Sequence, residues 1–276
     1  MSNEAKKFEE HGLKIDKDRI LTYSQLSCPL GCRYCFVDEL NFSPKDVGEY
    51  LTTSQIDILR DIPEEVKIIM IGCDTEFFLN KADSLRILNE LAKLGRDISV
   101  ITKLALDAKF IGELAVINEK LSQSGNSLFF SVTIPCLESA TIWEPNAPKP
   151  EARVTTLIEA NEARLPTLVA IRPLLPTVSE DELRRIVTKT RDYCMGFYSG
   201  PLYLKDINSG LLPDNTTGEL QIERVEPHWM PSGNIFYKIE RRGQMDLLRN
   251  LVISNGRLLF EGAAEAINHI KENEKH

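Results

Sequence analysis

The stretch Cys28-Pro29-Leu30-Gly31-Cys32-Arg33-Tyr34-Cys35-Phe36 holds three of the six cysteines of this chain. Thiolates at such short spacing are the ligands that iron–sulfur clusters prefer. Clusters that only carry electrons have four cysteine ligands, so three indicate a four-iron cluster with one iron left open for chemistry. The stretch therefore predicts a catalytic cluster bound to Cys28, Cys32 and Cys35.

A structural zinc site is the main alternative, but it needs a closed set of four Cys or His ligands. His11 lies upstream, and Cys73, Cys136 and Cys194 stand alone, so the fourth ligand would come from far along the chain. A disulfide framework is typical of small secreted proteins, whereas this chain spreads six cysteines over 276 residues. We therefore rank the cluster above both alternatives.

The composition is that of an ordinary globular protein, with 42% hydrophobic and 27% charged residues. No run of about 18 apolar residues occurs and the first ten residues contain no apolar leader core, so we expect a cytoplasmic protein with no membrane partner. The net charge of −8 argues against broad binding of nucleic acid, which depends on clustered Lys and Arg.

Short apolar runs alternate with amphipathic stretches, which is typical of βα units around a parallel sheet. Thr52 with Gln55 and Ser179 with Glu182 have the spacing of capping boxes at helix starts, and Gly95 fits a helix end. Six strands are predicted: Ile20–Ser27, Val66–Gly72, Ile98–Thr102, Leu128–Ile134, Thr167–Arg172 and Met195–Leu204.

The alternation stops near Asp206, and the polar segment 206–239, which includes the run 213–217, predicts a long loop. Leu251–Phe260, with Asn255-Gly256 at its centre, predicts a hairpin with a type I′ turn. A last helix is expected from about Gly262 to Ile270. We therefore divide the chain into a core, residues 1–205, and a covering loop, hairpin and helix, residues 206–276.

The pattern Cys-x3-Cys-x2-Cys, with an aromatic residue before the last cysteine, resembles the signature of the radical S-adenosylmethionine (SAM) superfamily. The resemblance implies an α/β fold, an open partial (β/α)6 TIM-like barrel with a short C-terminal α+β extension. It also implies a [4Fe-4S] cluster as cofactor, SAM as the second cofactor, and an electron donor such as flavodoxin or ferredoxin. The reduced cluster would cleave SAM to methionine and a 5′-deoxyadenosyl radical, which abstracts hydrogen from a substrate.

Further motifs look like the spore photoproduct lyase-like branch of that superfamily, over roughly residues 20–180. In that branch a Glu-Pro loop and a following arginine shape the site, which makes Glu144 and Arg153 a structural pair or a substrate contact; we favour structure. The motifs that match in order are Gly72–Glu76, Thr102-Lys103, Ser131–Thr133, Trp143–Pro145, Pro150–Arg153 and Arg172–Pro176.

The resemblance implies cofactor contacts for the aromatic residues of the cysteine stretch and for the side chains after the next strands. Tyr34 and Phe36 would shield the cluster and approach the adenine, with core packing as the alternative for each. Lys103 would meet the SAM carboxylate, with an exposed loop lysine as the alternative. Ser131 and Thr133, which alternation places on one face of their strand, suit the ribose and the carboxylate.

The turn Gly72-Cys73-Asp74-Thr75-Glu76 stands where many members of the superfamily bind the SAM ammonium group. Asp74, Thr75 or Glu76 would take that role, and the sequence does not choose among them. In the lyase a cysteine at a similar place donates hydrogen to the product radical, which makes Cys73 a catalytic candidate. Lone cysteines are more often small buried hydrophobes.

Three functions remain open at this point. The first is a radical SAM enzyme that acts on a small molecule, a nucleoside or a peptide. The second is a nucleic-acid lesion lyase, and the third is a non-catalytic metal-binding scaffold. We favour the first, because an acidic chain with no basic stripe and interleaved aromatics is a poor match for the extrusion of a lesion from duplex DNA.

Overall fold

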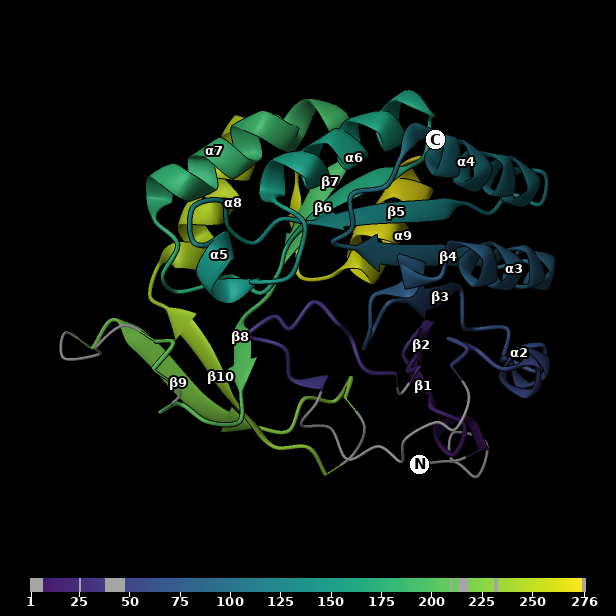
Figure 1. Cartoon of the computed structure of the whole chain (residues 1–276), viewed down its shortest axis with the longest axis horizontal. Helices are drawn as coiled ribbons and strands as arrows, with labels where there is room; N and C mark the ends of the chain where they lie inside the picture. Colours follow the sequence, from purple (N-terminus) through teal and green to yellow (C-terminus); the bar gives the residue numbers. More distant parts are fainter. Residues whose placement is uncertain are drawn as a thin grey trace.

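A computed structural model describes residues 7–24, 26–37, 48–208, 210–212, 218–230 and 233–274. These residues form an eight-stranded sheet, helices that pack on its two faces, and a separate three-stranded sheet (Figure 1). Among them, no helix combines the length and the apolar character needed to cross a membrane.

The large sheet is mostly parallel and follows chain order. β1 (Leu13–Asp16) and β2 (Arg19–Thr22) form an antiparallel hairpin at one edge. From β2 onward each strand pairs in parallel with the next, and β11 adds to the far edge beside β7. The parallel strands after β2 are β3 (Ile68–Ile71), β4 (Asp97–Thr102), β5 (Leu128–Thr133), β6 (Thr167–Ile171), β7 (Gly196–Ser199) and β11 (Leu259–Phe260).

The predicted parallel α/β class is confirmed, and each of the six predicted strands overlaps a strand of this sheet. The barrel of six βα units is not confirmed, because β1 and β11 extend the sheet to eight strands. The predicted strand Met195–Leu204 is two strands: β7 ends at Ser199, and β8 (Leu202–Leu204) belongs to the small sheet. Pro201 lies between them and has no N–H to continue a ladder.

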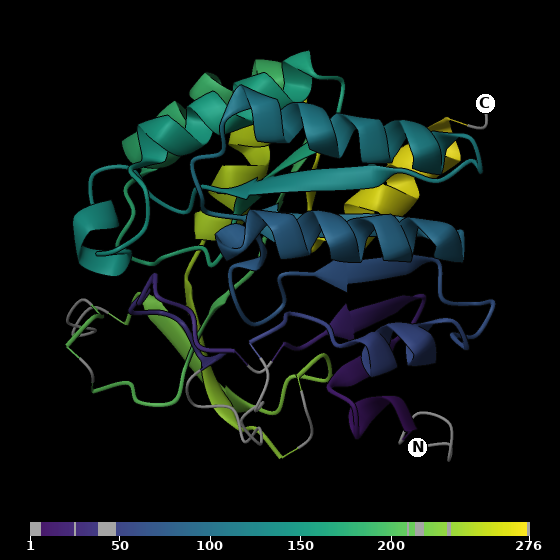
Figure 2. The ribbon, with the colours of Figure 1, turned by 45° about the vertical axis from the view of Figure 1, so that its right-hand side comes forward.

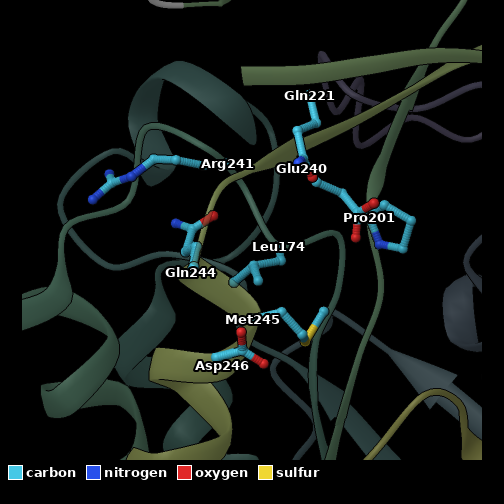
Figure 3. A pocket seen from close by; sticks show the side chains of 9 residues that line it. Leu174, Pro201, Gln221, Glu240, Arg241, Gln244, Met245 and Asp246 are labelled. Carbon is cyan, nitrogen blue, oxygen red and sulfur yellow. The ribbon is translucent and has the colours of Figure 1, made fainter. Parts of the chain in front are cut away.

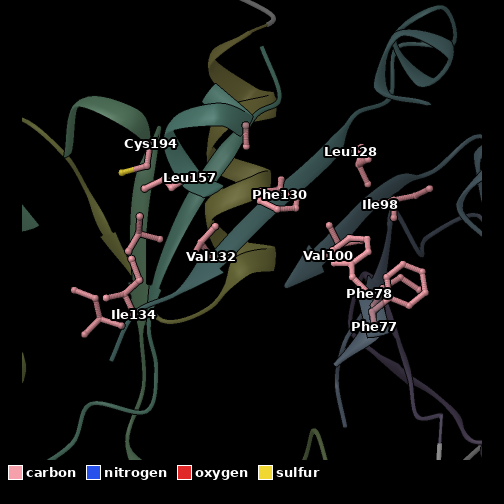
Figure 4. Packing of buried hydrophobic residues seen from close by; sticks show 14 of the residues in the cluster. Phe77, Phe78, Ile98, Val100, Leu128, Phe130, Val132, Ile134, Leu157 and Cys194 are labelled. Carbon is pink, nitrogen blue, oxygen red and sulfur yellow. The ribbon is translucent and has the colours of Figure 1, made fainter. Parts of the chain in front are cut away.

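Helices cover one face of the large sheet, and the apolar side chains of that face form the main core (Figure 4). Val100 from β4 and Phe130 and Val132 from β5 are fully buried there. The helices are α2 (Thr53–Leu59), α3 (Lys81–Leu91), α4 (Ala108–Ser122), α6 (Pro150–Glu162), α7 (Glu180–Thr190) and α8 (Gln244–Ser254). Shorter turns are η2 (Phe77–Leu79), η3 (Ala92–Leu94), α5 (Ala140–Trp143) and η4 (Arg191–Tyr193).

The predicted helix caps are largely confirmed. Thr52 and Gln55 close a reciprocal capping box at the start of α2, and Gly95 follows η3 in the left-handed conformation, with φ of 64°. Ser179 caps α7, as predicted, by accepting from the Glu182 amide. The Glu182 side chain instead accepts two backbone N–H bonds from the loop after β5, so it joins α7 to that loop rather than to its own cap.

The predicted hairpin at Leu251–Phe260 is wrong. Its first half is the end of α8, where Leu248, Leu251 and Val252 are buried at helical spacing. Asn255 caps this helix and Gly256 follows with φ of 73°, so the Asn-Gly pair ends a helix instead of turning a hairpin. The final helix is confirmed as α9 (Ala263–Asn273).

The predicted long loop, segment 206–239, contains regular structure. β9 (Leu220–Val225) pairs with β10 (Phe236–Arg241), which also pairs with β8, and all neighbours are antiparallel. β9 is almost entirely exposed. It therefore lacks the alternation of apolar and polar residues by which a half-buried strand is predicted from sequence. Residues 213–217 of the predicted loop lie outside the described residues.

Helix α9 packs on the opposite face of the large sheet from the other helices (Figures 1 and 2). Ala266 and Ile267 of α9 are fully buried in a second core with Ile68, Phe129 and Leu168. A closed parallel barrel fills its inner face with its own strand side chains. In this open sheet α9 supplies part of that filling.

Ile267→Ala should lower the free energy of unfolding by about 2–5 kcal/mol, because it leaves a cavity between α9 and the sheet. Ile253→Ala is the matched control: Ile253 lies on α8 with 55% of its surface exposed, so its loss should change stability by less than about 0.5 kcal/mol. Urea unfolding followed by circular dichroism measures both. Equal effects would show that α9 does not seal the inner face.

Candidate active site

The loop that carries the cysteines leaves the sheet at the carboxyl end of β2. Because β2 to β7 are parallel, their carboxyl ends meet at one edge, where parallel α/β folds bind their ligands. The loop crosses this edge and runs toward the small sheet (Figure 1). Phe36 and Val37 at its end pack with Met70 of β3 and Phe236 of β10.

Cys28, Cys32 and Cys35 are free thiols and half-buried. Burial raises the pKa of Cys32, and raises the pKa of Cys35 to about 11. The Lys103 ammonium opposes both shifts, and the neighbouring cysteines add to them, so these groups lie within electrostatic reach of one another. A metal-bound cysteine must lose its proton, and Lys103 favours the thiolate that results.

A site for a single metal ion differs from a cluster site, because at least three ligands must converge on one ion. Within the described ranges, no three side chains of His, Cys, Asp or Glu are placed to hold such an ion.

Tyr34 anchors the middle of the cysteine loop. Its hydroxyl donates a short hydrogen bond to the Glu144 carboxylate, and its ring lies 6.2 Å from that of Trp143. Burial, followed by the charge of Glu144, raises the pKa of Tyr34 well above its usual value. The Lys103 ammonium lies 5.6 Å from the centre of the Tyr34 ring, a cation–π distance. The side chain between two candidate cluster ligands is therefore fixed.

Glu144 in turn contacts Arg153, and this is the structural pair that we expected. Arg153 Nη2 and Glu144 Oε2 lie 2.5 Å apart with both side chains fully buried. The two atoms do not meet hydrogen-bond geometry, so the contact is mainly ionic. Arg153 also donates to the carbonyl oxygens of Thr133 and Pro148, at 3.0 and 2.8 Å. The chain of contacts joins the cysteine loop to the carboxyl end of β5.

Arg153→Met should lower the free energy of unfolding by about 3–5 kcal/mol, because it leaves the Glu144 carboxylate buried without a cation. Arg184→Met is the matched control, since the Arg184–Glu180 pair on α7 is half exposed and worth about 0–1 kcal/mol. Urea unfolding measures both. A small loss in Arg153→Met would mean that Glu144 does not depend on this cation.

Phe36 anchors the other end of the loop. Its ring packs edge-on against Trp229 at 5.6 Å and Phe236 at 5.8 Å. The Trp229 carbonyl accepts from the Tyr23 hydroxyl at 2.7 Å, which ties the tail to the strand that precedes the cysteines. The core-packing alternative thus describes both Tyr34 and Phe36, while their roles toward a cofactor stay predictions.

Cys73 packs, like Phe36 and Trp229, against the buried cluster that contains Tyr23 and Phe236. Its thiol donates to the Met70 carbonyl at 3.5 Å. Burial, with Asp74 second, raises the pKa of Cys73 to about 12. The group therefore keeps its S–H bond at neutral pH, as a hydrogen-atom donor must.

The two acidic residues of the turn after β3, Asp74 and Glu76, have different hydrogen-bond partners. Gly72 has φ of 87°, and a Cβ there would come within 2.9 Å of Ile101, so the close approach of β3 and β4 requires glycine. The Glu76 carboxylate has a structural role. It accepts hydrogen bonds from the Thr102 hydroxyl and from the amides of Lys103 and Phe78. Asp74 accepts from the Ser24 hydroxyl at 3.1 Å.

Ser131 and Thr133 lie on one face of β5, as the alternation predicted. The same face carries Phe129, which packs with α9, whereas Phe130 and Val132 point into the other core. The hydroxyls of Thr75 and Thr133 are buried without a hydrogen bond of good geometry in the described part of the chain. Buried hydroxyls without partners are typical of sites that a ligand completes.

Arg172 belongs to one of the motifs matched in the sequence, but the sequence alone predicts no role for it. The structure places its guanidinium 5.7 Å from the centre of the Trp229 ring, beside the aromatic cluster of the cysteine loop. The signal that could have found it is a charged residue directly after the apolar run of four residues that ends β6, at the edge where ligands bind.

A small cavity of about 150 Å³ lies elsewhere, between β10 and the start of α8 (Figure 3). Its lining includes Leu174, Glu240, Arg241 and Gln244. It is smaller than the roughly 300–1,000 Å³ of ligand pockets, and none of the cysteines lines it. It is not the site described above.

No protein-family model and no curated protein matches this chain. Solved structures do match. SuiB from Streptococcus suis, bound to S-adenosylmethionine, superposes with a TM-score of 0.53 and 14% identity over 76% of this chain. Spore photoproduct lyase, complexed with dinucleoside spore photoproduct, superposes with a TM-score of 0.60 and 9% identity over 83% of this chain. Both are radical SAM enzymes.

The chain has the fold of these two structures. The expected resemblance to this superfamily, and to spore photoproduct lyase within it, is therefore confirmed at the level of the fold. The match spans 46% of SuiB and 72% of the lyase, so this chain corresponds to less than half of the first protein and most of the second. SuiB has also been solved bound to its precursor peptide SuiA, with a TM-score of 0.50 and 15% identity over 71% of this chain and 42% of SuiB.

Proposed function

We propose that this protein is a radical SAM enzyme that binds a [4Fe-4S] cluster through Cys28, Cys32 and Cys35. The observation that carries the proposal is the placement of these three free thiols on the loop after β2, at the carboxyl edge of a radical SAM fold. Three ligands leave one position open, and a cluster bound there would supply the electron that cleaves SAM to methionine and a 5′-deoxyadenosyl radical.

The chain's own charges and hydroxyls support SAM binding beside the thiols. Lys103 suits the SAM carboxylate, because it is half-buried and close to the cysteines. For the SAM ammonium the structure favours Asp74 or Thr75 over Glu76, whose carboxylate already accepts three hydrogen bonds.

The other proposed roles near the SAM site belong to side chains on the inner face of the sheet and on the cysteine loop. Ser131 and Thr133 turn hydroxyls toward the inner face, where they suit the ribose and the carboxylate. Tyr34 and Phe36 hold the cysteine loop from its two sides and limit the access of water to it. Water exclusion matters because the radical reacts with any nearby hydrogen donor.

The proposed substrate is a small molecule, a nucleoside or a peptide. SuiB bound to its precursor peptide supports a peptide, and spore photoproduct lyase bound to a dinucleoside supports a nucleoside. Flavodoxin or ferredoxin is the proposed electron donor, and the cytoplasm the proposed location. A lesion lyase is not favoured, because the net charge of −8 opposes binding to duplex DNA.

In the proposed division the core, residues 1–205, contains Cys28, Cys32 and Cys35 and the parallel strands β2 to β7, while the parallel strand β11 lies in residues 206–276. Residues 206–276 cover the core. Two contacts support this division: Trp229 packs on Phe36 beside the cysteines, and α9 packs on the inner face of the sheet.

Cys32→Ala should abolish 5′-deoxyadenosine formation, since it removes one of three proposed cluster ligands. The assay uses anaerobically reconstituted protein with SAM and a strong reductant, and chromatography detects the product. Cys194→Ala is the control: Cys194 is buried at the start of β7, far along the chain from the loop, and its loss should leave activity near wild type. An active Cys32→Ala protein would refute the proposed cluster ligands.

Cys73→Ala should leave SAM cleavage intact but change the fate of the substrate radical, because the thiol is proposed to return a hydrogen atom. In deuterated water the Cys73 thiol exchanges to S–D, so wild-type product should acquire deuterium. Mass spectrometry measures the label. If deuterium incorporation were the same in both proteins, Cys73 would not be the donor.

A further inference from the structure

The guanidinium of Arg172 lies on the inner face of the sheet, where β6 ends. One nitrogen, Nη1, donates to the Glu261 carbonyl at 2.9 Å, just before α9 begins. A Cβ added at Gly200 would lie 3.0 Å from the guanidinium, so the Arg172 side chain packs closely against that backbone. The ring of Trp229 lies 5.7 Å away on another side. The position of Arg172 is therefore set by three segments.

This charge has no anionic partner among the described residues, none of which places a carboxylate within 4.0 Å of it. Burial lowers the pKa of Arg172, Tyr203 and Tyr198 oppose this shift, and a second cation, Arg19, adds to it. Arg19 is already paired with Asp16 at 2.6 Å. Of the five N–H donors of the Arg172 guanidinium, one is used by the Glu261 carbonyl. A half-buried cation of this kind lacks a counter-charge.

The site holds a second cation, Lys103, directly after β4, and it too forms no ion pair with the described residues. SAM has one carboxylate, and Lys103, beside the cysteines and Tyr34, is the closer candidate for it. Arg172 is reached from the cysteine loop across two ring contacts, from Phe36 to Trp229 and from Trp229 to the guanidinium. Trp229 therefore lies between Arg172 and the Phe36 end of the cysteine loop.

Tyr198 lies near both Arg172 and Ser131, the candidate ribose contact on β5. It lies on the inner face of β7, and burial raises its pKa to about 12, while Ser131 and Arg172 act in the opposite direction. Arg172, Tyr198 and Ser131 therefore line one continuous part of the inner face, from the end of β6 to the candidate ribose contacts on β5.

We propose that Arg172 binds an oxyanion of the substrate, a phosphate or a carboxylate, and so orients the substrate toward the SAM site. The inference rests on the proposed function and narrows its substrate class to acidic molecules such as a nucleotide or a carboxylic acid. The planar guanidinium can hold either oxyanion with two parallel hydrogen bonds, and the Trp229 ring supports it from one side.

The test is a titration of the full chain with inorganic phosphate and, separately, with acetate, at constant ionic strength. Quenching of tryptophan fluorescence reports binding near Trp229, and the rise of the melting temperature is a second readout. We expect saturable binding of at least one anion. Arg172→Gln should weaken it about tenfold or more, and Arg172→Lys less. Tighter binding of phosphate or of acetate identifies which oxyanion the site prefers.

Two further variants separate this proposal from its alternatives. Arg184→Gln, on the exposed face of α7, should leave anion binding unchanged. Lys103→Gln should weaken SAM binding and spare phosphate binding. Wild-type protein that binds neither anion, or Arg172→Gln protein that binds them as wild type does, overturns the proposal. So does an equal loss of SAM and anion affinity in Arg172→Gln, which would make Arg172 a contact of the SAM carboxylate.

The result does not depend on the proposed chemistry. Anion binding needs neither the cluster nor SAM cleavage, so Cys32→Ala should bind phosphate as tightly as wild type. Loss of 5′-deoxyadenosine formation with intact phosphate binding, or the reverse, tells which of the two proposals fails.

Discussion

Parallel pairing of β2 to β7 in chain order is the constraint on which this site depends. Parallel strands all end at the same edge, so residues far apart in the sequence meet there: the cysteine loop after β2, the acidic turn after β3, Lys103 after β4 and Arg172 after β6. The same pairing requires every connection to cross over through a helix on the outer face. That leaves the inner face to α9 and to the ligand-facing side chains.

The cysteine loop has no regular secondary structure, so side-chain contacts must hold it. Tyr34 points toward Glu144 and Arg153 on the α6 side, and Phe36 points toward Trp229 and the small sheet. These side-chain contacts hold the loop, and with it the thiols, without a ladder of backbone hydrogen bonds. The buried Glu144–Arg153 pair has a large desolvation cost. It also couples the loop to the end of β5, where the candidate SAM hydroxyls lie.

Charge is distributed unevenly over this acidic protein. The exposed surface carries many paired charges, whereas Lys103 and Arg172 at the site have no carboxylate partner among the described residues. A half-buried cation attracts anions more strongly than the same charge on the surface, because water screens it less. The acidic exterior is expected to repel long polyanions, whereas these two cations suit the small oxyanion proposed above.

The sequence by itself determined the parallel α/β class, the caps of α2 and α7, and the common face of Ser131 and Thr133, and it predicted the cysteine ligand set. These depend on local spacing and on alternation, which short segments encode. Tertiary structure decided that Leu251–Phe260 is a helix end and an added strand, that segment 206–239 contains β9 and β10, and that Glu76 is a structural group. It also decided the setting of Arg172. Those outcomes depend on which distant segments supply the hydrogen bonds and the counter-charges, and no local pattern records them.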